Sequence, residues 1–261
     1  MYGWGDGEKL LGTALARSAT RSPSPPSSAS SPTPPRCSAP TPAPWIRKVV
    51  DDSLRNLGVD YIDVLYQHMD DPNVSVEDVV GVMKEYVDAG KVKYLGLSNT
   101  TPDNVRRAHA VHPIAVLQTE YSIFARRSEA FFPVLEELGI GLVAYSPLAR
   151  GFLSGAVKPR DQHAADDFRQ YIPWWAPEHF DANVAITAEL TKLAEGKGTT
   201  LAQLALAWLL EKKDYIVPIP GSRNPERVAQ NLAAAEVKLT ADDLARIDEI
   251  APNGGVSGYL T

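Results

Sequence analysis

From residue 45 onward, short apolar runs alternate with longer segments in which apolar residues recur every three or four positions. The short runs are typical of buried strands, and the longer segments are typical of helices with one apolar face. Regular alternation of the two indicates consecutive β–α units and a parallel sheet. Strands are predicted over residues 61–66, 93–97, 115–117 running into QTEYS, 141–145 and 215–219.

The helical spacing, together with start signals, predicts the helices between and after these strands. Thr101 and Thr240 each stand before early acidic residues, as helix-capping threonines do. The predicted helices cover residues 76–89, 102–110, 128–138, 182–197, 201–211, 225–235 and 241–250. Two further helices are predicted over residues 7–17 and from about Trp45.

Residues 18–44 break this pattern. They hold 9 of the 21 prolines and no Leu, Ile, Val, Phe, Tyr or Trp. Proline removes backbone donors, and a segment without large apolar side chains cannot offset its ordering entropy. We therefore predict a disordered coil without any packed element. Its composition resembles translation in a shifted reading frame.

Length, charge and cysteine content narrow the class of protein. A chain of 261 residues suits one (β/α)8 barrel, so a single domain over residues 1–261 is predicted. The net charge of −6 argues against nucleic acid or anionic lipid as a partner. Cys37 is the sole cysteine, which excludes internal disulfides and thiolate metal sites, and no His residues show metal-ligand spacing. With no long apolar run or secretory signal, a cytoplasmic protein is expected.

Polar residues follow every predicted strand, beginning with Gln67-His68 and Ser98-Asn99. In a parallel α/β barrel the active site lies at the carboxyl ends of the strands. The repeated placement therefore predicts one shared pocket.

A series of motifs at these strand ends resembles one enzyme family. The chain contains, in order, MYG, LGVDYIDVLYQH, AGKVKYLGLSN, LQTEYS, GLVAYSPLARGFLSG and VPIPGSRNPERVAQN. They are similar to aldo-keto reductase signatures, and the resemblance covers residues 1–17 and about 45–250. It implies an α/β fold, the (β/α)8 or TIM barrel, and reduction of aldehydes or ketones to alcohols by hydride transfer from NADPH.

The resemblance also assigns roles to individual residues. Tyr2 matches the family's proton donor, and His68 matches the histidine that assists it. Ser98, Asn99 and Gln118 would hold the nicotinamide carboxamide. The remaining cofactor residues are Tyr145 stacking on the ring, Ser146, Leu148 and Gly151 at the pyrophosphate, and Gly221, Ser222, Arg223, Arg227, Gln230 and Asn231 at the adenosine end.

Other roles are possible for the same residues. His68 can be a buried structural histidine, and Ser98 and Asn99 can cap the helix that follows. Arg223 and Arg227 can form a solvated helix face. Trp174 and Trp175, in a long loop, are either core anchors or part of a substrate pocket wall.

The sequence departs from the family near its start. There is no lysine between Lys9 and Lys48, where the family lysine is expected. The family aspartate, the first strand and most of the second are expected to be missing, so the predicted barrel is incomplete and truncated, with a coil replacing its third strand. The alternatives are therefore a non-catalytic nicotinamide-binding or regulatory module, similar to potassium-channel β subunits, or an inactive product of a damaged gene.

Overall fold

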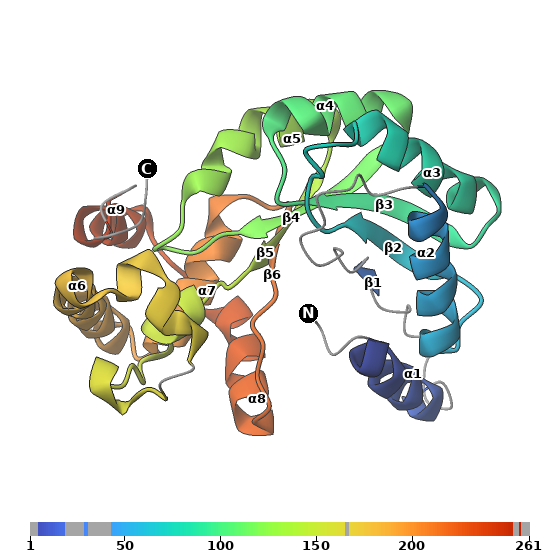
Figure 1. Ribbon diagram of the computed structural model, residues 1–261. Coiled ribbons are helices and arrows are strands. Elements are labelled where there is room, and N and C mark those ends of the chain that lie inside the picture. Colours follow the sequence, from blue (N-terminus) through green and yellow to red (C-terminus); the bar gives the residue numbers. More distant parts are fainter. Residues whose placement is uncertain (1–4, 19–28, 31–42, 165–166, 253–255, 257–261) are drawn as a thin grey trace. The chain divides into compact units, whose positions relative to one another are not determined.

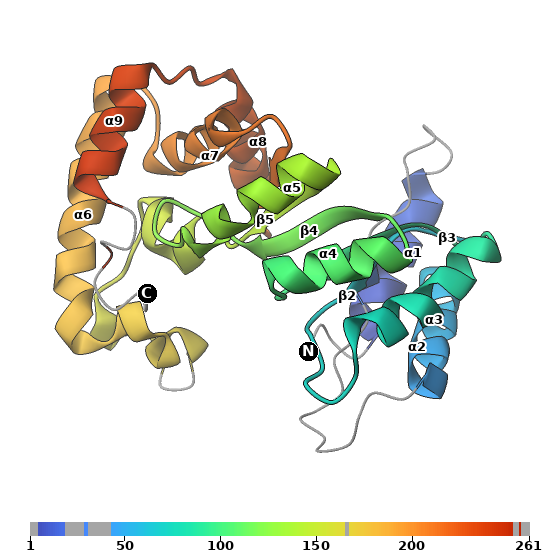
Figure 2. The same ribbon diagram turned by 90° about the horizontal axis from the view of Figure 1, so that it is seen from above.

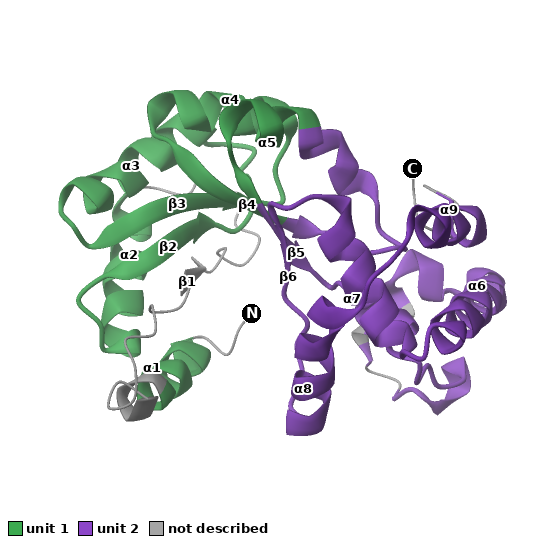
Figure 3. Ribbon diagram, turned by 180° about the vertical axis from the view of Figure 1, so that it is seen from behind, with its two compact units in different colours: residues 1–118, 133–141 green, residues 119–132, 142–261 purple. Residues whose placement is uncertain are grey.

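The computed structural model describes residues 5–18, 29–30, 43–164, 167–252 and 256. They fall into two compact units, shown in different colours in Figure 3. Unit 1 comprises residues 1–118 and 133–141, and unit 2 comprises residues 119–132 and 142–261. The single domain over residues 1–261 stays a prediction.

Unit 1 is built on parallel strands, and its strand positions confirm the sequence pattern. In the register of the sheet, Gln67 lies opposite Leu97 and Ser98 lies opposite Gln118. The polar residues at the ends of three strands are thereby aligned. The strands are β1 (Ala29–Ser30), β2 (Ile62–Gln67), β3 (Val92–Ser98) and β4 (Ile114–Glu120), whose last two residues belong to unit 2.

Strand β1 corrects one expectation about residues 18–44. Ala29 and Ser30 pair in parallel with Leu65 and Tyr66 of β2, where no packed element was predicted. Strand pairing uses backbone groups and needs no large side chain, and neither residue is a proline. Ser18 lies in the first helix, Ala43 and Pro44 lie in the second, and the rest of the segment is outside the described residues, so its disorder stays a prediction.

The helices of unit 1 pack against one another and against the strands. Figures 1 and 2 both show α3 and α4 side by side along the sheet. Thr101 caps α4, because its side chain accepts a hydrogen bond from the Asn104 backbone amide. The helices are α1 (Asp6–Ser18), α2 (Ala43–Leu57), α3 (Val76–Asp88), α4 (Pro102–Val111) and α5 (Phe132–Leu138), whose first residue belongs to unit 2.

A glycine on β3 determines how the central strands of unit 1 pack. Gly96 lies opposite Tyr66, and a Cβ atom at Gly96 would lie 2.6 Å from two ring carbons of Tyr66 and 3.0 Å from Val116 Cγ2. Tyr66 is 4% exposed, so its ring fills the space that a larger residue would need. Position 96 therefore requires glycine for packing.

Unit 2 holds two parallel strands and most of the C-terminal helices. Its strands are β5 (Gly141–Tyr145), whose first residue belongs to unit 1, and β6 (Ile216–Pro218). Helix α6 begins five residues earlier than predicted because Pro177 occupies its first turn, where a missing N–H is tolerated. The helices are α6 (Pro177–Gly196), α7 (Leu201–Lys212), α8 (Pro225–Ala233) and α9 (Ala241–Ile250).

Short 3₁₀ turns modify two of the predicted helices and fill the loop after β5. The predicted helix 128–138 is a 3₁₀ turn followed by α5, and the predicted helix 225–235 is α8 followed by a 3₁₀ turn. The 3₁₀ turns are η2 (Arg127–Phe131), η3 (Ala149–Ser154), η4 (Arg160–Gln162), η5 (Phe168–Tyr171), η6 (Pro173–Trp175) and η7 (Ala234–Glu236). Among the described residues, no helix is both long enough and apolar enough to cross a bilayer.

Aromatic side chains form the core of unit 2. Phe152 packs against Trp175 with ring centroids 4.5 Å apart and against Phe180 at 5.4 Å. Helix α7 is buried along most of its length, with Trp208 fully buried 5.4 Å from the ring of Tyr121. The core therefore fixes the loop after β5 against α6 and α7.

Candidate functional site

In unit 1, the predicted site residues gather at the carboxyl ends of β2, β3 and β4. His68 follows the last residue of β2 and is half-buried, and burial lowers the pKa of its imidazole. Desolvation disfavours the charged ring, so His68 is neutral at pH 7. A neutral imidazole presents one N–H donor and one acceptor.

Asn99 joins the β3 end to the β2 end. Its side-chain amide donates to the His68 carbonyl oxygen and to Ser98 Oγ, both at 2.9 Å. The backbone of Asn99 is left-handed, with φ of 49°, a conformation that asparagine tolerates better than most residues. Ser98 is buried, so the exposed Asn99 amide is held over a rigid strand end.

Gln118 lies opposite Ser98 and hydrogen-bonds the phenol of Tyr66. Burial raises the pKa of Tyr66 to about 12, and the bond from Gln118 acts in the opposite direction. Tyr66 therefore stays protonated at neutral pH. Unit 1 thus brings together His68, Ser98, Asn99 and Gln118, whose roles stay predictions.

In unit 2, eight of the predicted cofactor residues line one cavity of about 710 Å³. Its volume lies within the range of about 300–1,000 Å³ that is typical of sites for small molecules and cofactors. Residues from the loop after β5, the end of β6 and helix α8 meet there. The predicted residues in its wall are Ser146, Leu148, Gly151, Gly221, Ser222, Arg227, Gln230 and Asn231.

The loop after β5 is strained along one side of this cavity. Ser146, Ala149 and Arg150 all have left-handed φ values, between 48° and 54°, and Gly151 has φ of 111°. Such conformations cost non-glycine residues about 1 kcal/mol or more each and concentrate at functional sites. Backbone hydrogen bonds from Ala149 to Ser146 and from Gly151 to Leu148 hold the loop.

The start of helix α8 and the turn before it also line the cavity. Asn224 caps α8 by accepting hydrogen bonds from the amides of Glu226 and Arg227, and Ser222 Oγ accepts from the Asn224 amide at 3.1 Å. These turns place Gly221, Ser222 and the side chain of Arg227 at the positive end of the helix dipole, which favours anions.

The charge of the cavity wall is strongly positive. Among the described residues, four cationic side chains line it, from Arg150, Lys158, Arg169 and Arg227, against one carboxylate, Asp167. Lys158 and Arg227 form no ion pair with any residue in the described ranges. This wall therefore suits a ligand that carries several negative charges, as a dinucleotide does.

Asp167 and Arg169 form a tightly bonded pair in this wall. Arg169 donates through Nε and Nη2 to the Asp167 carboxylate and contacts His163 Nδ1 at 3.1 Å. The guanidinium holds the pKa of the Asp167 carboxyl well below its usual range. Arg169 also lies over the ring of Trp175, at 5.2 Å, so Trp175 is both a core residue and part of the cavity wall. Trp174 is buried but does not line the cavity.

Three predicted site residues stand apart from these groups. Tyr2 lies outside the described residues. Tyr145 and Arg223 do not line the cavity, and Arg223 is exposed. Conversely, Arg150, Lys158 and Arg169 line it without having been predicted; a basic residue in the long loop after β5 is the signal that could have indicated them.

No group of three His, Cys, Asp or Glu residues suited to a metal ion occurs in the part of the chain that the structure describes.

A model of the aldo/keto reductase family matches residues 1–252. The chain belongs to this family. It is 42% identical over 215 residues to "probable aldo-keto reductase 1" of Glycine max, a match that spans 82% of this chain and 62% of that protein. It is 41% identical over 218 residues to aldo-keto reductase str7 of Strobilurus tenacellus, spanning 82% of this chain and 65% of that protein. The chain thus spans somewhat less than two thirds of the length of these relatives.

Solved structures share the fold of this aldo/keto reductase family member. A glycerol dehydrogenase from Gluconobacter oxydans superposes with a TM-score of 0.84 at 26% identity, covering 95% of this chain and 78% of that one. A thermostable aldo-keto reductase in complex with the inhibitor epalrestat gives 0.73 at 24% identity, covering 95% and 79%. The fold class is therefore the (β/α)8 barrel, of which the described residues hold six strands.

Proposed function

We propose that this chain is an NADPH-dependent oxidoreductase that reduces aldehydes or ketones to alcohols. The observation that carries the proposal is the cationic cavity of unit 2, lined by the Ser146–Gly151 turn and the start of α8. A dinucleotide with a 2′-phosphate needs hydrogen-bond donors for its pyrophosphate and a positively charged side chain for its 2′-phosphate. Backbone amides of a tight turn and an arginine supply these donors.

We assign the ends of this cofactor to particular residues. Ser146, Leu148 and Gly151 would hold the pyrophosphate, and Arg227, Gln230 and Asn231 would hold the adenosine end, with Arg227 on the 2′-phosphate. In unit 1, Ser98, Asn99 and Gln118 present amide and hydroxyl groups that suit a carboxamide. Tyr145 and Arg223 are retained as cofactor residues through the family resemblance alone.

His68 is proposed to contact the carbonyl substrate, in contrast to the residues that bind the cofactor. When bound, NADPH would supply the hydride for the carbonyl carbon. Because burial lowers the pKa of His68, its neutral ring would donate one hydrogen bond to the carbonyl oxygen rather than a full positive charge. We propose Tyr2 as the proton donor to that oxygen, from its match to the family motif.

A second candidate function is nicotinamide dinucleotide binding without turnover. The observation that favours it is the absence of lysine between Lys9 and Lys48, because the family uses a lysine to assist its tyrosine. A phenol has an unperturbed pKa of about 10, and a neighbouring ammonium would make it a better proton donor near neutral pH.

One experiment separates these functions. NADPH binding is measured by quenching of tryptophan fluorescence, and turnover by the loss of NADPH absorbance with a panel of aromatic aldehydes. Binding with turnover supports the reductase, and binding without turnover supports the second function. Failure of NADPH to bind a cooperatively folded chain excludes both.

We also propose a cytoplasmic location and no nucleic acid or membrane partner. A single cysteine and a net charge of −6 support this assignment. Fluorescence microscopy of a tagged chain tests the location, and enrichment in a secretory compartment would contradict it.

A further inference from the structure

Asp70 links the loop that carries His68 to the turn that carries Asn99. It lies two residues after His68, and its Oδ2 accepts hydrogen bonds from Thr100 Oγ1 and from Asn104 Nδ2, both at 2.8 Å. Asn99 adds a third bond between the same segments, through its donation to the His68 carbonyl oxygen. The loop after β2 is therefore joined at two points to the turn after β3 and at a third point to the first turn of α4.

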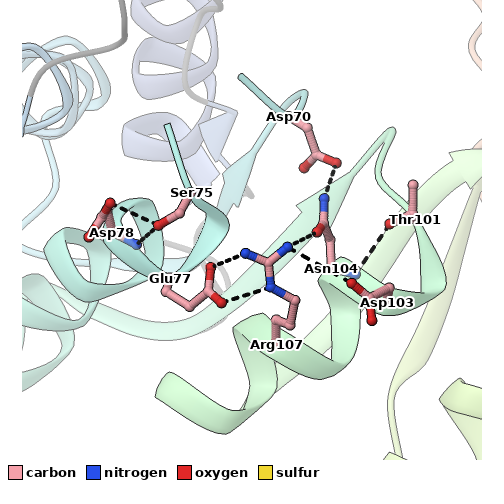
Figure 4. A network of polar contacts seen from close by, with 8 residues as sticks. All are labelled: Asp70, Ser75, Glu77, Asp78, Thr101, Asp103, Asn104 and Arg107. Atoms are coloured by element: carbon pink, nitrogen blue, oxygen red, sulfur yellow. Dashed lines mark hydrogen bonds and ion pairs between the residues drawn. The ribbon is translucent and has the colours of Figure 1, made fainter. Parts of the chain in front are cut away.

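The orientation of Asn104 is fixed from its other side (Figure 4). Arg107 donates to Asn104 Oδ1 at 3.0 Å and makes two bonds of 2.7 Å to the Glu77 carboxylate. Because Asn104 Oδ1 must accept from Arg107, its Nδ2 group must face Asp70. A chain of bonds from α3 through α4 thus directs a donor at the Asp70 carboxylate.

The second oxygen of the Asp70 carboxylate is buried at a cost in free energy. Its Oδ1 is buried and has no hydrogen-bond partner among the described residues. An unsatisfied buried oxygen typically costs about 1–3 kcal/mol, and more when charged. Such half-satisfied groups concentrate where precise placement matters.

We propose that Asp70 is a positioning residue for carbonyl reduction, which holds His68 and Asn99 in one fixed arrangement. This inference rests on the proposed function, since it assumes that His68 faces the substrate carbonyl. Asp70 acts through the two loops and does not itself contact substrate or cofactor. Thr100 contributes to this positioning because its hydroxyl donates a hydrogen bond to the Asp70 carboxylate.

The test compares Asp70→Ala, Asp70→Asn and Thr100→Ala with the control Asp103→Asn. Asp103 is a 79% exposed carboxylate on α4, and its ion pair with Arg107, at 3.9 Å, involves neither Asp70 nor Thr100. Asp70→Ala should lower kcat by about tenfold to a hundredfold, because small displacements of reacting groups have effects of this size. Its NADPH affinity should stay within about threefold of the parent, since charged groups of unit 2 supply most of that affinity. Asp70→Asn keeps an acceptor oxygen and should retain most of kcat.

A double-mutant cycle and a spectroscopic measurement distinguish positioning from loss of stability. Asp70→Ala/Thr100→Ala should lose no more kcat than Asp70→Ala alone, because both changes break one link. The ring protons of the five histidines are titrated by NMR, and His68 is assigned by its absence in His68→Phe. In Asp70→Ala the pKa of His68 should rise toward the ordinary value as the ring becomes hydrated. If the variant only removed the negative charge of Asp70, without hydration of the ring, the pKa of His68 should fall instead.

The outcomes separate this inference from the proposed function. If the parent chain neither binds nor turns over NADPH, the proposed function is wrong. The His68 titration still tests whether Asp70 positions His68. If Asp70→Ala leaves both kcat and the His68 titration as in Asp103→Asn, Asp70 has no positioning role. If Asp70→Ala fails to fold, Thr100→Ala decides the question by the same two measurements.

Discussion

The guanidinium of Arg150 donates a hydrogen bond of 3.2 Å from Nε to Oε1 of Glu120. Both residues are in unit 2, Glu120 at the end of β4 and Arg150 in the strained turn after β5. Arg150 also lines the cationic cavity. The pair therefore connects a rigid strand end to the turn proposed to bind pyrophosphate.

Replacing Glu120 tests whether this pair holds the turn. Glu120→Ala removes the acceptor and should weaken NADPH binding by about tenfold, the effect of losing one charge-assisted hydrogen bond. Glu120→Gln keeps an oxygen acceptor and should stay within about threefold of the parent. Fluorescence titration measures both affinities, and equal effects of the two variants would contradict a role for the hydrogen bond.

The same residue predicts a pH dependence of stability. Burial raises the pKa of Glu120, and Arg150 opposes that rise. The folded state then holds the proton more tightly than the unfolded state, so stability falls as pH rises from the unfolded pKa of 4.5 through the raised folded pKa. Glu120→Gln has no titrating group at this position, so it should not lose stability for this reason. The free energy of unfolding of the parent, relative to Glu120→Gln, should decrease across that window in urea titrations. An increase would contradict the assignment.

Arg227 tests the choice between NADPH and NADH. Arg227→Gln should weaken NADPH binding by about tenfold or more, the effect of one charge-assisted bond to the 2′-phosphate, and leave NADH binding nearly unchanged. The matched control is Arg246→Gln, which removes an exposed arginine paired with Glu249 on α9. Equal weakening of both cofactors by Arg227→Gln would place Arg227 away from the 2′-phosphate.

The sequence predicts the strands and helices because their signals are local. Apolar spacing locates β2 to β6 within a few residues, and threonine caps locate the starts of α4 and α9. Polar residues directly after β2 and β3 are brought together because parallel strands align their carboxyl ends. The closeness of His68 and Asn99 could be predicted for this reason.

The links between loops could not be predicted from local signals. Thr100 lies 30 residues from Asp70, and Arg150 lies 30 residues from Glu120. In the sequence each appears as an ordinary polar residue, and only the packing of successive β–α units brings the partners within hydrogen-bond distance. The same reason applies to Arg169, whose place in the cavity wall depends on its bond to Asp167 and its contact with Trp175.

Gly96 tests the packing of β2 against β3. Gly96→Ala places a Cβ atom 2.6 Å from the Tyr66 ring and should destabilise the chain by about 1–3 kcal/mol, as overpacking does. Gly81→Ala is the control, because that position on α3 is open and alanine favours a helix by up to about 1 kcal/mol. Urea unfolding should therefore give midpoints that move in opposite directions. A shared direction would contradict the packing argument.

Arg126 is a buried charge in unit 2. It is 7% exposed, donates to Glu129 at 2.8 Å and to Asp248 at 2.6 Å, and lies over the Trp208 ring. Glu129 also accepts from the Tyr121 hydroxyl, and burial raises the pKa of that phenol, so the tyrosine stays a donor. Glu129 therefore depends on several donors at once.

Arg126→Met should destabilise unit 2 by about 1–3 kcal/mol, because it leaves the half-buried Glu129 carboxylate, 21% exposed, without its main cation. Arg246→Met removes an ion pair whose partners are 55% and 65% exposed and should cost less than about 1 kcal/mol. Urea unfolding followed by tryptophan fluorescence measures both. A cooperative transition in the parent also argues against an unfolded product of a damaged gene. Equal losses in the two variants would mean that contacts with Tyr121 and Lys212 are sufficient for the Glu129 carboxylate.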